Sequence, residues 1–223
     1  MLADLGEAED GCTGMSELYR DYGYESQDAS HMHRHILPVL LAMCDRLGRG
    51  VRVLDVGCGN GFIAGQFAGK GCEVVGVDLS ESGIALARRT YPAARFEVLP
   101  ADSSILANLR CEPFDLVVST EVVEHLYAPR LLAAGCFGAL RPGGRFICST
   151  PDHGYVKNLA LAMVNKWDSH ADPLWDGGHI KLWSRKTLSR LLTETGFVNL
   201  QFRGAGRVPW LWMTMVMSGD RPL

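Results

Sequence analysis

The 223-residue sequence lacks several features that would mark whole classes of protein. No apolar run approaches the length of a membrane span, and the first residues, MLADLGEAEDG, are acidic where a secretory signal needs positive charge and an apolar core. The 22 Lys and Arg are outnumbered by 25 Asp and Glu, so the net charge is -3 and the pI is near 6.2. We therefore expect a cytoplasmic protein that has no membrane span, binds no nucleic acid and acts on a small molecule.

Cysteine is present, but without the spacing that metal or redox sites need. The cysteines are odd in number and include no C-x-x-C pair: Cys12, Cys44, Cys58, Cys72, Cys111, Cys136 and Cys148. We expect reduced thiols that pack as small hydrophobes rather than a catalytic thiol. No internal repeat, low-complexity tract or linker divides the chain, so we expect a single domain over residues 1–223.

From Val51 onward, short β-branched segments alternate with longer helical patterns. The expected strands are VRVLDV, CEVVGVD, ARFEVL, FDLVVST and GRFICST, and the helices between them include FIAGQFAGK, ESGIALARRT and PRLLAAGCFGAL. Ser80 is the expected N-cap of the second of these helices. This alternation predicts an α/β fold with a doubly wound, mostly parallel seven-stranded sheet, Rossmann-like, with helices on both faces.

Four segments are expected within this domain. Residues 1–50 would form an N-terminal helical cover, interrupted near Pro38, and residues 51–150 would form the cofactor-binding core. Residues 151–183 break the rhythm of strand and helix and predict a lid or binding loop. Residues 184–223 contain the last helix and two edge strands, FVNLQF and WLWMTMVM, expected as an antiparallel hairpin.

Glycine is concentrated in the stretch VLDVGCGNGF, directly after the first apolar run. Glycines in G-x-G-x-G spacing are combined here with an acid and an amide: Gly57, Gly59, Gly61, Asp55 and Asn60. A dinucleotide fingerprint needs a glycine in the sixth position, where this sequence has Phe62, and no Lys or Arg occurs between Val53 and Gly69. Such a loop lets a ligand approach the backbone closely, but it is a poor cradle for a pyrophosphate.

Acidic side chains follow the next two expected strands. Asp78 closes the second strand, 21 residues after Gly57, where a carboxylate can accept both hydroxyls of a ribose. Asp102 follows the third strand, where it either receives an adenine amino group or simply caps the residues after it. Together with the glycine loop, these positions predict a nucleoside that bears a carboxylate and an amine instead of phosphates.

This order of motifs resembles the class I S-adenosylmethionine-dependent methyltransferases, over most of the chain from about Val51 to Met217. The resemblance implies S-adenosyl-L-methionine as cofactor, with the three glycines around its methionine half and Asp78 at its ribose. It implies further cofactor contacts from residues beside these motifs: Asp55, Asn60, Leu79, Asp102, Ser103, Thr120 and Glu121. Asp102 and Ser103 would meet the adenine. Thr120 and Glu121 would face the sulfonium.

Histidines that follow strands or close the expected lid are the candidate catalytic bases: His125, His153 and His179. The stretch EVVEHL resembles the matching part of the ubiquinone-pathway O-methyltransferases, and GGHIKLWSRKTLSRLLTETGF resembles their late segment. This resemblance implies O-methylation of a phenolic or other hydroxyl group on a small molecule. C- or N-methylation is the near alternative, and a noncatalytic S-adenosylmethionine-binding protein or an NAD-dependent oxidoreductase is a more distant one.

A divalent metal is allowed by the sequence but is not predicted. Glu121, Glu124 and His125 are spaced i, i+3, i+4, so on a helix they would share one face, and His179 could complete a set suited to Mg, Mn or Zn. Small-RNA 2′-O-methyltransferases have a similar acid and histidine cluster. The same spacing equally suits a cofactor contact from Glu121 with a helix cap beside it.

The tryptophans all lie in the last third of the chain: Trp167, Trp175, Trp183, Trp210 and Trp212. The first three belong to the expected lid and would offer flat walls to an aromatic or prenylated acceptor. They would equally serve to pack the lid onto the sheet. The sequence makes no prediction of the oligomeric state.

Overall fold

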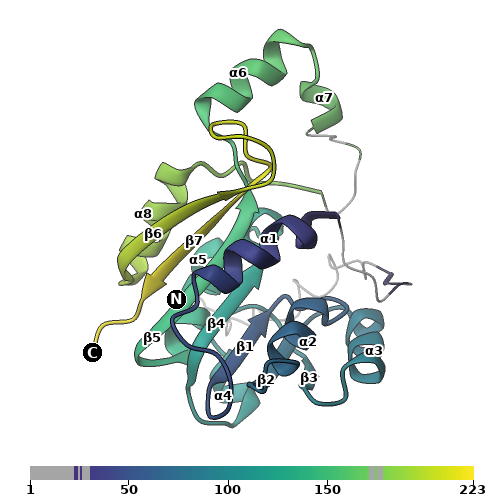
Figure 1. The fold of residues 1–223 in the computed structure, drawn as a ribbon, viewed down its shortest axis with the longest axis vertical. Coiled ribbons are helices and arrows are strands. Elements are labelled where there is room, and N and C mark those ends of the chain that lie inside the picture. The colour runs from purple at the N-terminus through teal and green to yellow at the C-terminus, as the bar shows by residue number, and fades with distance from the viewer. Residues whose placement is uncertain (1–22, 25, 27–30, 171–173, 175–177) are drawn as a thin grey trace, which may run out of the picture.

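The computed structural model describes residues 23–24, 26, 31–170, 174 and 178–223. Figure 1 shows a central sheet with helices packed on both of its faces. Residues 1–22 of the expected N-terminal cover and Trp175 of the expected lid lie outside the described part of the chain. Among the helices described, none combines the length and the apolar character needed to cross a bilayer.

The sheet has seven strands in the order β3-β2-β1-β4-β5-β7-β6. The strands are β1 (Arg52–Val56), β2 (Glu73–Asp78), β3 (Arg95–Val98), β4 (Phe114–Thr120), β5 (Leu140–Pro151), β6 (Val198–Ala205) and β7 (Thr214–Asp220). Strands β1 to β5 pair in parallel, and β7 runs antiparallel between β5 and β6. The mostly parallel, doubly wound sheet is confirmed. Because strand order reverses between β1 and β4, their carboxyl ends frame the usual ligand crevice of such a sheet.

Helices form a layer on each face of the sheet. They are α1 (His31–Ala42), α2 (Phe62–Ala68), α3 (Glu81–Thr90), α4 (Ile105–Leu109), the 3₁₀ turn η1 (Val123–His125), α5 (Pro129–Ala139), α6 (Tyr155–Met163), α7 (Trp167–His170) and α8 (Arg185–Thr195). Buried Leu40, Phe67 and Ile84 anchor α1, α2 and α3 in one core. Leu132 and Leu188 anchor α5 and α8 in the core of the other face. Fully burying a side chain of this size stabilises the fold by about 2 kcal/mol.

Local signals explain where two of these helices begin and end. The Ser80 hydroxyl accepts a hydrogen bond from the Gly83 N–H over 3.0 Å at the start of α3, as its position before the helical pattern predicts. At α8, Ser184 and Thr187 form a capping box, and Gly196 ends the helix with φ of +110°. Both helices therefore start on serine caps.

The predicted interruption of the first helix near Pro38 is wrong. Helix α1 runs through Pro38 without a break. Proline removes the hydrogen bond to the carbonyl of Arg34, but both residues are exposed, so water can satisfy that carbonyl. Ile36 and Leu40 on the inner side are fully buried, and their packing holds the helix together.

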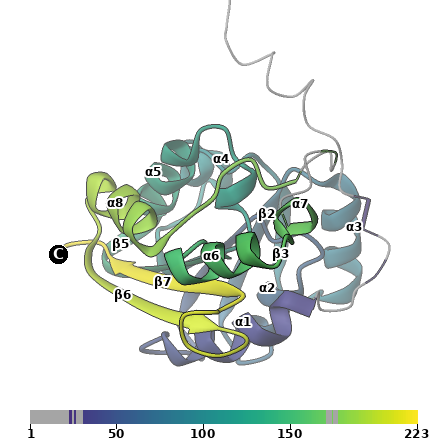
Figure 2. The ribbon, with the colours of Figure 1, turned by 90° about the horizontal axis from the view of Figure 1, so that it is seen from above.

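Two strand boundaries also differ from the prediction. Strand β5 starts at Leu140 rather than Gly144, because the LRPGG stretch forms a bulge against β4 instead of a separate turn. Strand β7 starts at Thr214, so Trp210 and its neighbours up to Met213 belong to the β6–β7 connection. The expected lid contains the two short helices α6 and α7, which stand beyond the carboxyl end of β5 (Figures 1 and 2).

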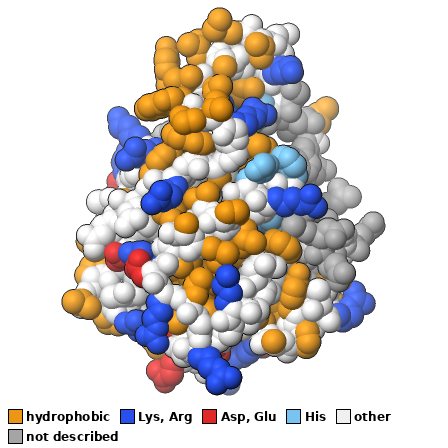
Figure 3. All heavy atoms as spheres, in the orientation of Figure 1, with side chains coloured by type: hydrophobic (Ala, Val, Ile, Leu, Met, Phe, Trp, Pro, Cys, Tyr) orange, Lys and Arg blue, Asp and Glu red, His pale blue; other side chains and the backbone are white. Residues whose placement is uncertain are grey.

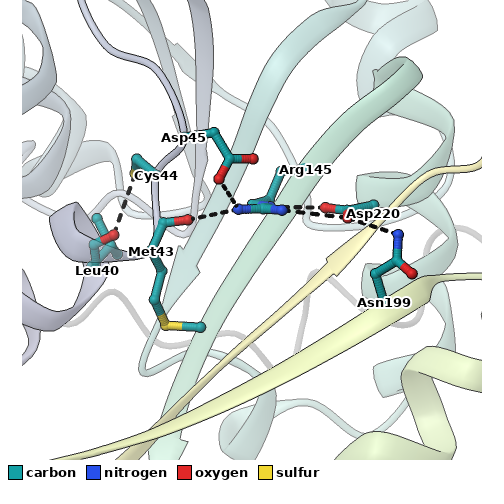
Figure 4. A network of polar contacts seen from close by, with 7 residues as sticks. All are labelled: Leu40, Met43, Cys44, Asp45, Arg145, Asn199 and Asp220. Atoms are coloured by element: carbon teal, nitrogen blue, oxygen red, sulfur yellow. Dashed lines mark hydrogen bonds and ion pairs between the residues drawn. The ribbon is translucent and has the colours of Figure 1, made fainter.

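A polar network at the opposite end of β5 joins elements that are distant in the sequence (Figure 4). Arg145 of β5 donates to the Met43 carbonyl over 3.1 Å and to Asp45 Oδ1 over 2.6 Å, just after α1. Its Nε and Nη2 donate to the two oxygens of Asp220 at the end of β7, over 2.8 and 3.3 Å. Asn199 of β6 donates to the same carboxylate over 3.2 Å. The Arg145 guanidinium thus joins the segment after α1 to β5 and β7. This network lies at the end of the sheet opposite the ligand crevice.

Candidate functional site

A tight loop of glycines follows β1 at the reversal point of the sheet. Gly57, Gly59 and Gly61 have φ of +75°, +50° and +78°, in the left-handed region that favours glycine. The Gly57 N–H donates to the Val77 carbonyl over 2.8 Å, and the Gly59 N–H donates to Asp78 Oδ2 over 2.8 Å. The end of β2 therefore holds the loop in shape.

None of these glycines leaves room for a side chain, and a Cβ on Gly61 would lie 2.7 Å from the Ala87 Cβ. A Cβ on Gly57 would lie 2.3 Å from a methyl group of Val122, and a Cβ on Gly59 would lie 2.5 Å from the Tyr24 hydroxyl. Tyr24 is placed there by its own N–H, which donates to Ser82 Oγ over 3.2 Å. The described part of the N-terminal segment therefore lies against the glycine loop.

Asp55 and Asp78 place two carboxyl groups beside this loop. Asp55 is fully buried in β1, and neither of its carboxyl oxygens has a hydrogen-bond partner among the described residues. Burial, followed by the charge of Asp78, raises the pKa of Asp55 to about 7. A buried carboxyl group of this kind fits the ammonium group of an amino acid, and an acid at the end of β2 fits a ribose, so the residues present suit S-adenosylmethionine.

Two of the remaining predicted cofactor residues, Asn60 and Asp102, have hydrogen-bond partners within the protein. Asn60 Nδ2 donates to the Ser26 carbonyl over 2.9 Å. Asp102 Oδ1 accepts from the Ser104 N–H over 2.8 Å and from its hydroxyl over 2.6 Å, so Asp102 organises the turn that leads into α4. Leu79 and Ser103 are exposed beside Asp78 and Asp102. Their contacts with the cofactor stay a prediction.

Glu121 lies at the end of β4, where β4, β5 and β7 meet. Its φ of +55° is unusual for a residue other than glycine. Its Oε1 accepts hydrogen bonds from Ser149 Oγ and Thr214 Oγ1, each over 2.8 Å, while the neighbouring Thr120 is buried. Burial raises the pKa of Glu121, although the two hydroxyl groups lower it. The carboxyl group is therefore turned toward β5 and β7.

Glu124, His125 and His179 lie together beyond the carboxyl end of β4, and we call them the acid–histidine cluster. Each offers one ligand atom, and these atoms all lie within 4.8 Å of one another. The rings of His125 and His179 are 5.0 Å apart, centroid to centroid. The Glu124 carbonyl accepts from the N–H groups of Ile180 and Lys181 over 3.0 Å each, which fixes the loop carrying His179 against η1.

The helical face expected for Glu121, Glu124 and His125 is not formed. The chain makes only the single 3₁₀ turn η1 after β4, and the positive φ of Glu121 turns its side chain away. The structure instead groups Glu124 and His125 with His179, which the sequence offered only as a completing member. Spacing in the sequence cannot show this, because the separation i, i+3 brings side chains together only on a continuous helix.

Within the cluster, the carboxyl group of Glu124 has a strongly raised pKa. Its side chain is 1% exposed, and neither carboxyl oxygen has a hydrogen-bond partner among the described residues. Burial raises the pKa of Glu124 well above its ordinary value, and the charge of Glu121 raises it further. His125 Nε2 lies 4.0 Å from Glu124 Oε1. A carboxyl group with a raised pKa can lose its proton when a cation or a ligand binds beside it.

Two further histidines adjoin the cluster. His153 follows β5, and its ring centroid is 5.2 Å from that of His170 on α7, a residue that the sequence did not single out. Burial first, then the charges of Lys157 and His170, lower the pKa of His153 to about 4. Burial, followed by the charge of His125, lowers the pKa of His179 to about 4 as well. At neutral pH the imidazoles of His153 and His179 are therefore uncharged and can accept a proton or bind a metal.

The two described tryptophans of the expected lid, Trp167 and Trp183, differ in their surroundings. Trp183 is buried, and its Nε1 donates to the Val123 carbonyl over 3.3 Å, so it serves to fix η1. The Trp167 ring lies 6.3 Å from the His153 ring and borders the histidines. Trp210 and Trp212 lie in the β6–β7 connection with ring centroids 6.0 Å apart.

Comparison with known proteins agrees with this arrangement. A family model described as a methyltransferase domain matches residues 29–201. A ubiquinone biosynthesis O-methyltransferase of Dinoroseobacter shibae is 32% identical over 165 residues, which cover 70% of this chain and 63% of that protein. A protein of the same name from Aromatoleum aromaticum is 27% identical over 207 residues, covering 91% of this chain and 87% of its own length.

Solved structures share the fold at lower identity. Magnesium protoporphyrin IX methyltransferase of Synechocystis, with bound S-adenosylhomocysteine, has a TM-score of 0.62 at 15% identity and covers 83% of this chain and 80% of its own. A SAM-dependent methyltransferase of Archaeoglobus fulgidus has a TM-score of 0.61 at 17% identity, with 83% and 93% covered. At such identities the likeness concerns the fold alone.

Proposed function

The chain belongs to the class I S-adenosylmethionine-dependent methyltransferases, and from that premise we propose that it transfers the methyl group to a hydroxyl oxygen of a small molecule, most directly a phenol. The observation that carries this proposal is the acid–histidine cluster at the carboxyl end of β4, next to the strand that carries the glycine loop. An oxygen nucleophile needs a proton acceptor, and the cluster supplies imidazoles with a carboxyl group beside them. The relatives named as O-methyltransferases support the same chemistry.

His125 is the residue best placed to take the acceptor proton. Its Nδ1 lies 3.2 Å from the Gly178 carbonyl, and the tautomer that donates this hydrogen bond makes Nε2 the accepting nitrogen. Glu124 Oε1 lies 4.0 Å from that Nε2 and would stabilise the imidazolium that forms. In this arrangement the Gly178 carbonyl orients the ring through Nδ1, and the carboxyl group of Glu124 faces the nitrogen that would take the proton.

The cofactor and the acceptor would be held on neighbouring strands. S-adenosylmethionine, when bound, supplies a methyl group on a positively charged sulfur, which any nucleophile in line with that bond can displace. Asp55, Gly57 and Gly59 would bind its amino acid half, and Asp78 would bind its ribose. His153 and Trp167 would border the acceptor and keep water out.

The acid–histidine cluster also fits a divalent cation. A buried carboxyl group without a hydrogen-bond partner and two imidazoles are the donor types that Zn²⁺ and Mn²⁺ accept. A bound cation would lower the pKa of an acceptor hydroxyl, so the same residues would then ligate instead of taking the proton.

The test is a transfer assay with labelled S-adenosylmethionine and a panel of phenols, catechols, amines and carbon acids. We expect O-methylated phenol or catechol as the product by mass spectrometry and NMR. His125→Asn should lower kcat about 100-fold or more. The exposed His31→Asn is the matched control and should retain full activity.

The same assay decides between the alternatives. Transfer to nitrogen or carbon, or cofactor binding without transfer to any acceptor, would overturn the proposal. Repeating the assay with a chelator, and then with Mg²⁺, Mn²⁺ or Zn²⁺ restored, assigns proton removal either to the imidazole alone or to a metal held by the cluster.

A further inference from the structure

Helix α6 turns its one charged residue away from water. Lys157 is 5% exposed, whereas Tyr155 and Met163 on the same helix are 81% and 78% exposed. Figure 3 shows hydrophobic side chains gathered at the end of the molecule where α6 lies. A surface lysine reaches water easily through its flexible stem, so an ammonium group buried under a surface helix needs a reason.

This ammonium group forms no ion pair with a carboxylate among the described residues. Its one hydrogen bond within that part of the chain runs from Nζ to the Met213 carbonyl, over 3.2 Å. Burial lowers the pKa of Lys157, whereas the charges of Asp152 and Glu121 raise it. Glu121 directs its Oε1 to two hydroxyl groups instead. An ammonium group has more N–H donors than a single carbonyl uses, so Lys157 can donate to a ligand as well.

Two imidazole nitrogens without a partner lie near Lys157. His153 is 6% exposed, and neither its Nε2 nor that of His170 has a hydrogen-bond partner in the described part of the chain. Asn158 donates from Nδ2 to the His153 carbonyl over 3.2 Å, so its Oδ1, 3.3 Å from His153 Nδ1, accepts the ring N–H and leaves Nε2 as an acceptor. After burial, the charge of Lys157 is the largest influence that lowers the pKa of both histidines, so its ammonium group is close to their rings.

These groups come from separate segments and meet beyond the carboxyl ends of β4 and β5. Lys157 lies on α6, His153 follows β5 and His170 lies on α7, while Glu121 at the end of β4 is near enough for its charge to act on Lys157. An ammonium group donates hydrogen bonds and carries positive charge, whereas a neutral imidazole accepts a proton. This combination matches a phenol hydroxyl that is losing its proton.

We propose that Lys157 contacts the acceptor oxygen and stabilises the phenolate that is methylated. His125 takes the hydroxyl proton, and both electrons of the O–H bond stay on the oxygen. The phenolate oxygen then bonds to the methyl carbon while the bond from that carbon to sulfur breaks, with its electron pair left on sulfur. Lys157 keeps its own protons and lowers the pKa of the bound hydroxyl through its charge. This role rests on the proposed function.

The first test is spectroscopic and needs no methyl transfer. Para-nitrophenol is bound to the full chain with S-adenosylhomocysteine and titrated with pH, and its yellow phenolate band reports its ionisation. We expect a lower pKa for the bound phenol than for the free one. Lys157→Gln, which can keep the hydrogen bond to Met213 but not the charge, should raise the pKa of the bound phenol by about 1 or more, and Lys157→Arg should keep it low. The exposed Lys166→Met should match the wild type.

Other titratable or charged groups surround Lys157 on every side, and they are unchanged in these variants, so the difference between variants isolates the ammonium group. They are Glu121, Asp152, His153, His170, His179 and Arg207.

Kinetics give a second readout. With weakly acidic phenols, Lys157→Gln should lower kcat about tenfold or more, because less phenolate forms. With nitrophenols that are already ionised at the assay pH, the same variant should lose little. A lysine that only holds α6 in place would lower both rates equally.

Three results would overturn the proposal: no binding of para-nitrophenol, the same phenolate titration in wild type and Lys157→Gln, or equal kinetic losses with weak and strong phenols. Lys157 would then be a structural tie between α6 and the β6–β7 connection. The two proposals fail separately. A chain that binds the phenolate through Lys157 but methylates no oxygen loses the proposed function, and a chain that methylates phenols equally well without Lys157 loses only this inference.

Discussion

A buried carboxyl group without a hydrogen-bond partner is costly, and Glu124 holds two such oxygens at 1% exposure. Nothing in the packing of η1 requires an acid at this position, because Val123 beside it supplies the apolar contact with the core. A residue that weakens the fold and lies beside two histidines is more simply explained by chemistry than by stability.

We expect Glu124→Gln to raise the free energy of unfolding by about 1 kcal/mol at neutral pH and to lower methyl transfer. Because the pKa of Glu124 is raised in the folded protein, the wild type loses stability as pH rises above the ordinary carboxyl range, and the glutamine variant lacks that loss. Urea unfolding from about pH 5 to about pH 8 measures the difference. The exposed Glu112→Gln is the control, and a variant less stable than the wild type throughout would show that other contacts hold the acid in place.

Asp78 is the residue expected to accept hydrogen bonds from the ribose hydroxyl groups. Asp78→Ala should weaken S-adenosylhomocysteine binding by about 2 kcal/mol, because two charge-assisted hydrogen bonds are lost. Titration calorimetry measures this loss, and Glu81→Ala on the first turn of α3 is the control. The carboxylate also holds the N–H of Gly59, so the thermal midpoint of each variant should be compared. Unchanged affinity would remove the ribose assignment.

The sequence predicted the positions of the glycines and Asp78 in the fold better than those of the residues near the histidines. The glycines and Asp78 follow strands directly, so strand position alone places them at one edge of the sheet. The direction of the Glu121 side chain and the position of His170 could not be predicted in this way. The direction of the Glu121 side chain depends on a positive φ that no local sequence pattern predicts. His170 lies on a four-residue helix inside an irregular segment.

At the scale of elements, N-cap residues and apolar periodicity predicted most of the helices. Ser80 is such a local signal, and its role as the N-cap of α3 is confirmed. Helix α6 gave no such signal, because its outward face is apolar and its lysine is buried. The 3.6-residue pattern predicts a helix only when one face is polar.

Arg145 adds a polar contact between β5, the end of β7 and the segment after α1, and this contact is not predictable from local sequence. We expect Arg145→Met to lower the free energy of unfolding by about 2 kcal/mol, because a half-buried Asp220 would lose both of its hydrogen bonds from the guanidinium. Chemical denaturation measures this change. Arg190→Met, which breaks the exposed pair with Glu194, should leave stability nearly unchanged, and equal losses in the two variants would contradict the account.

At the scale of the whole molecule, alternation of strand and helix was sufficient to predict the layers and the strand directions. The order of strands places the glycine loop and the acid–histidine cluster on neighbouring strands, β1 and β4. That placement follows from the doubly wound topology and not from any single residue.

Cofactor binding should stabilise the molecule as a unit. At about 100 times its Kd, S-adenosylhomocysteine should add about 2.7 kcal/mol and raise the thermal midpoint by about 5 to 10 °C. NAD⁺ at the same concentration should leave the midpoint unchanged, since the loop offers no Lys or Arg to a pyrophosphate. Scanning calorimetry measures both, and a larger shift with NAD⁺ would contradict the cofactor assignment.

The most direct measurement is a crystal structure of the full chain with S-adenosylhomocysteine. The account predicts the adenosine beside Asp78 and the sulfur at the carboxyl ends of β1 and β4, with room for one acceptor ring between the sulfur and His125. A sulfur that faces away from the acid–histidine cluster, or a side chain filling the space between them, would contradict methyl transfer at this cluster.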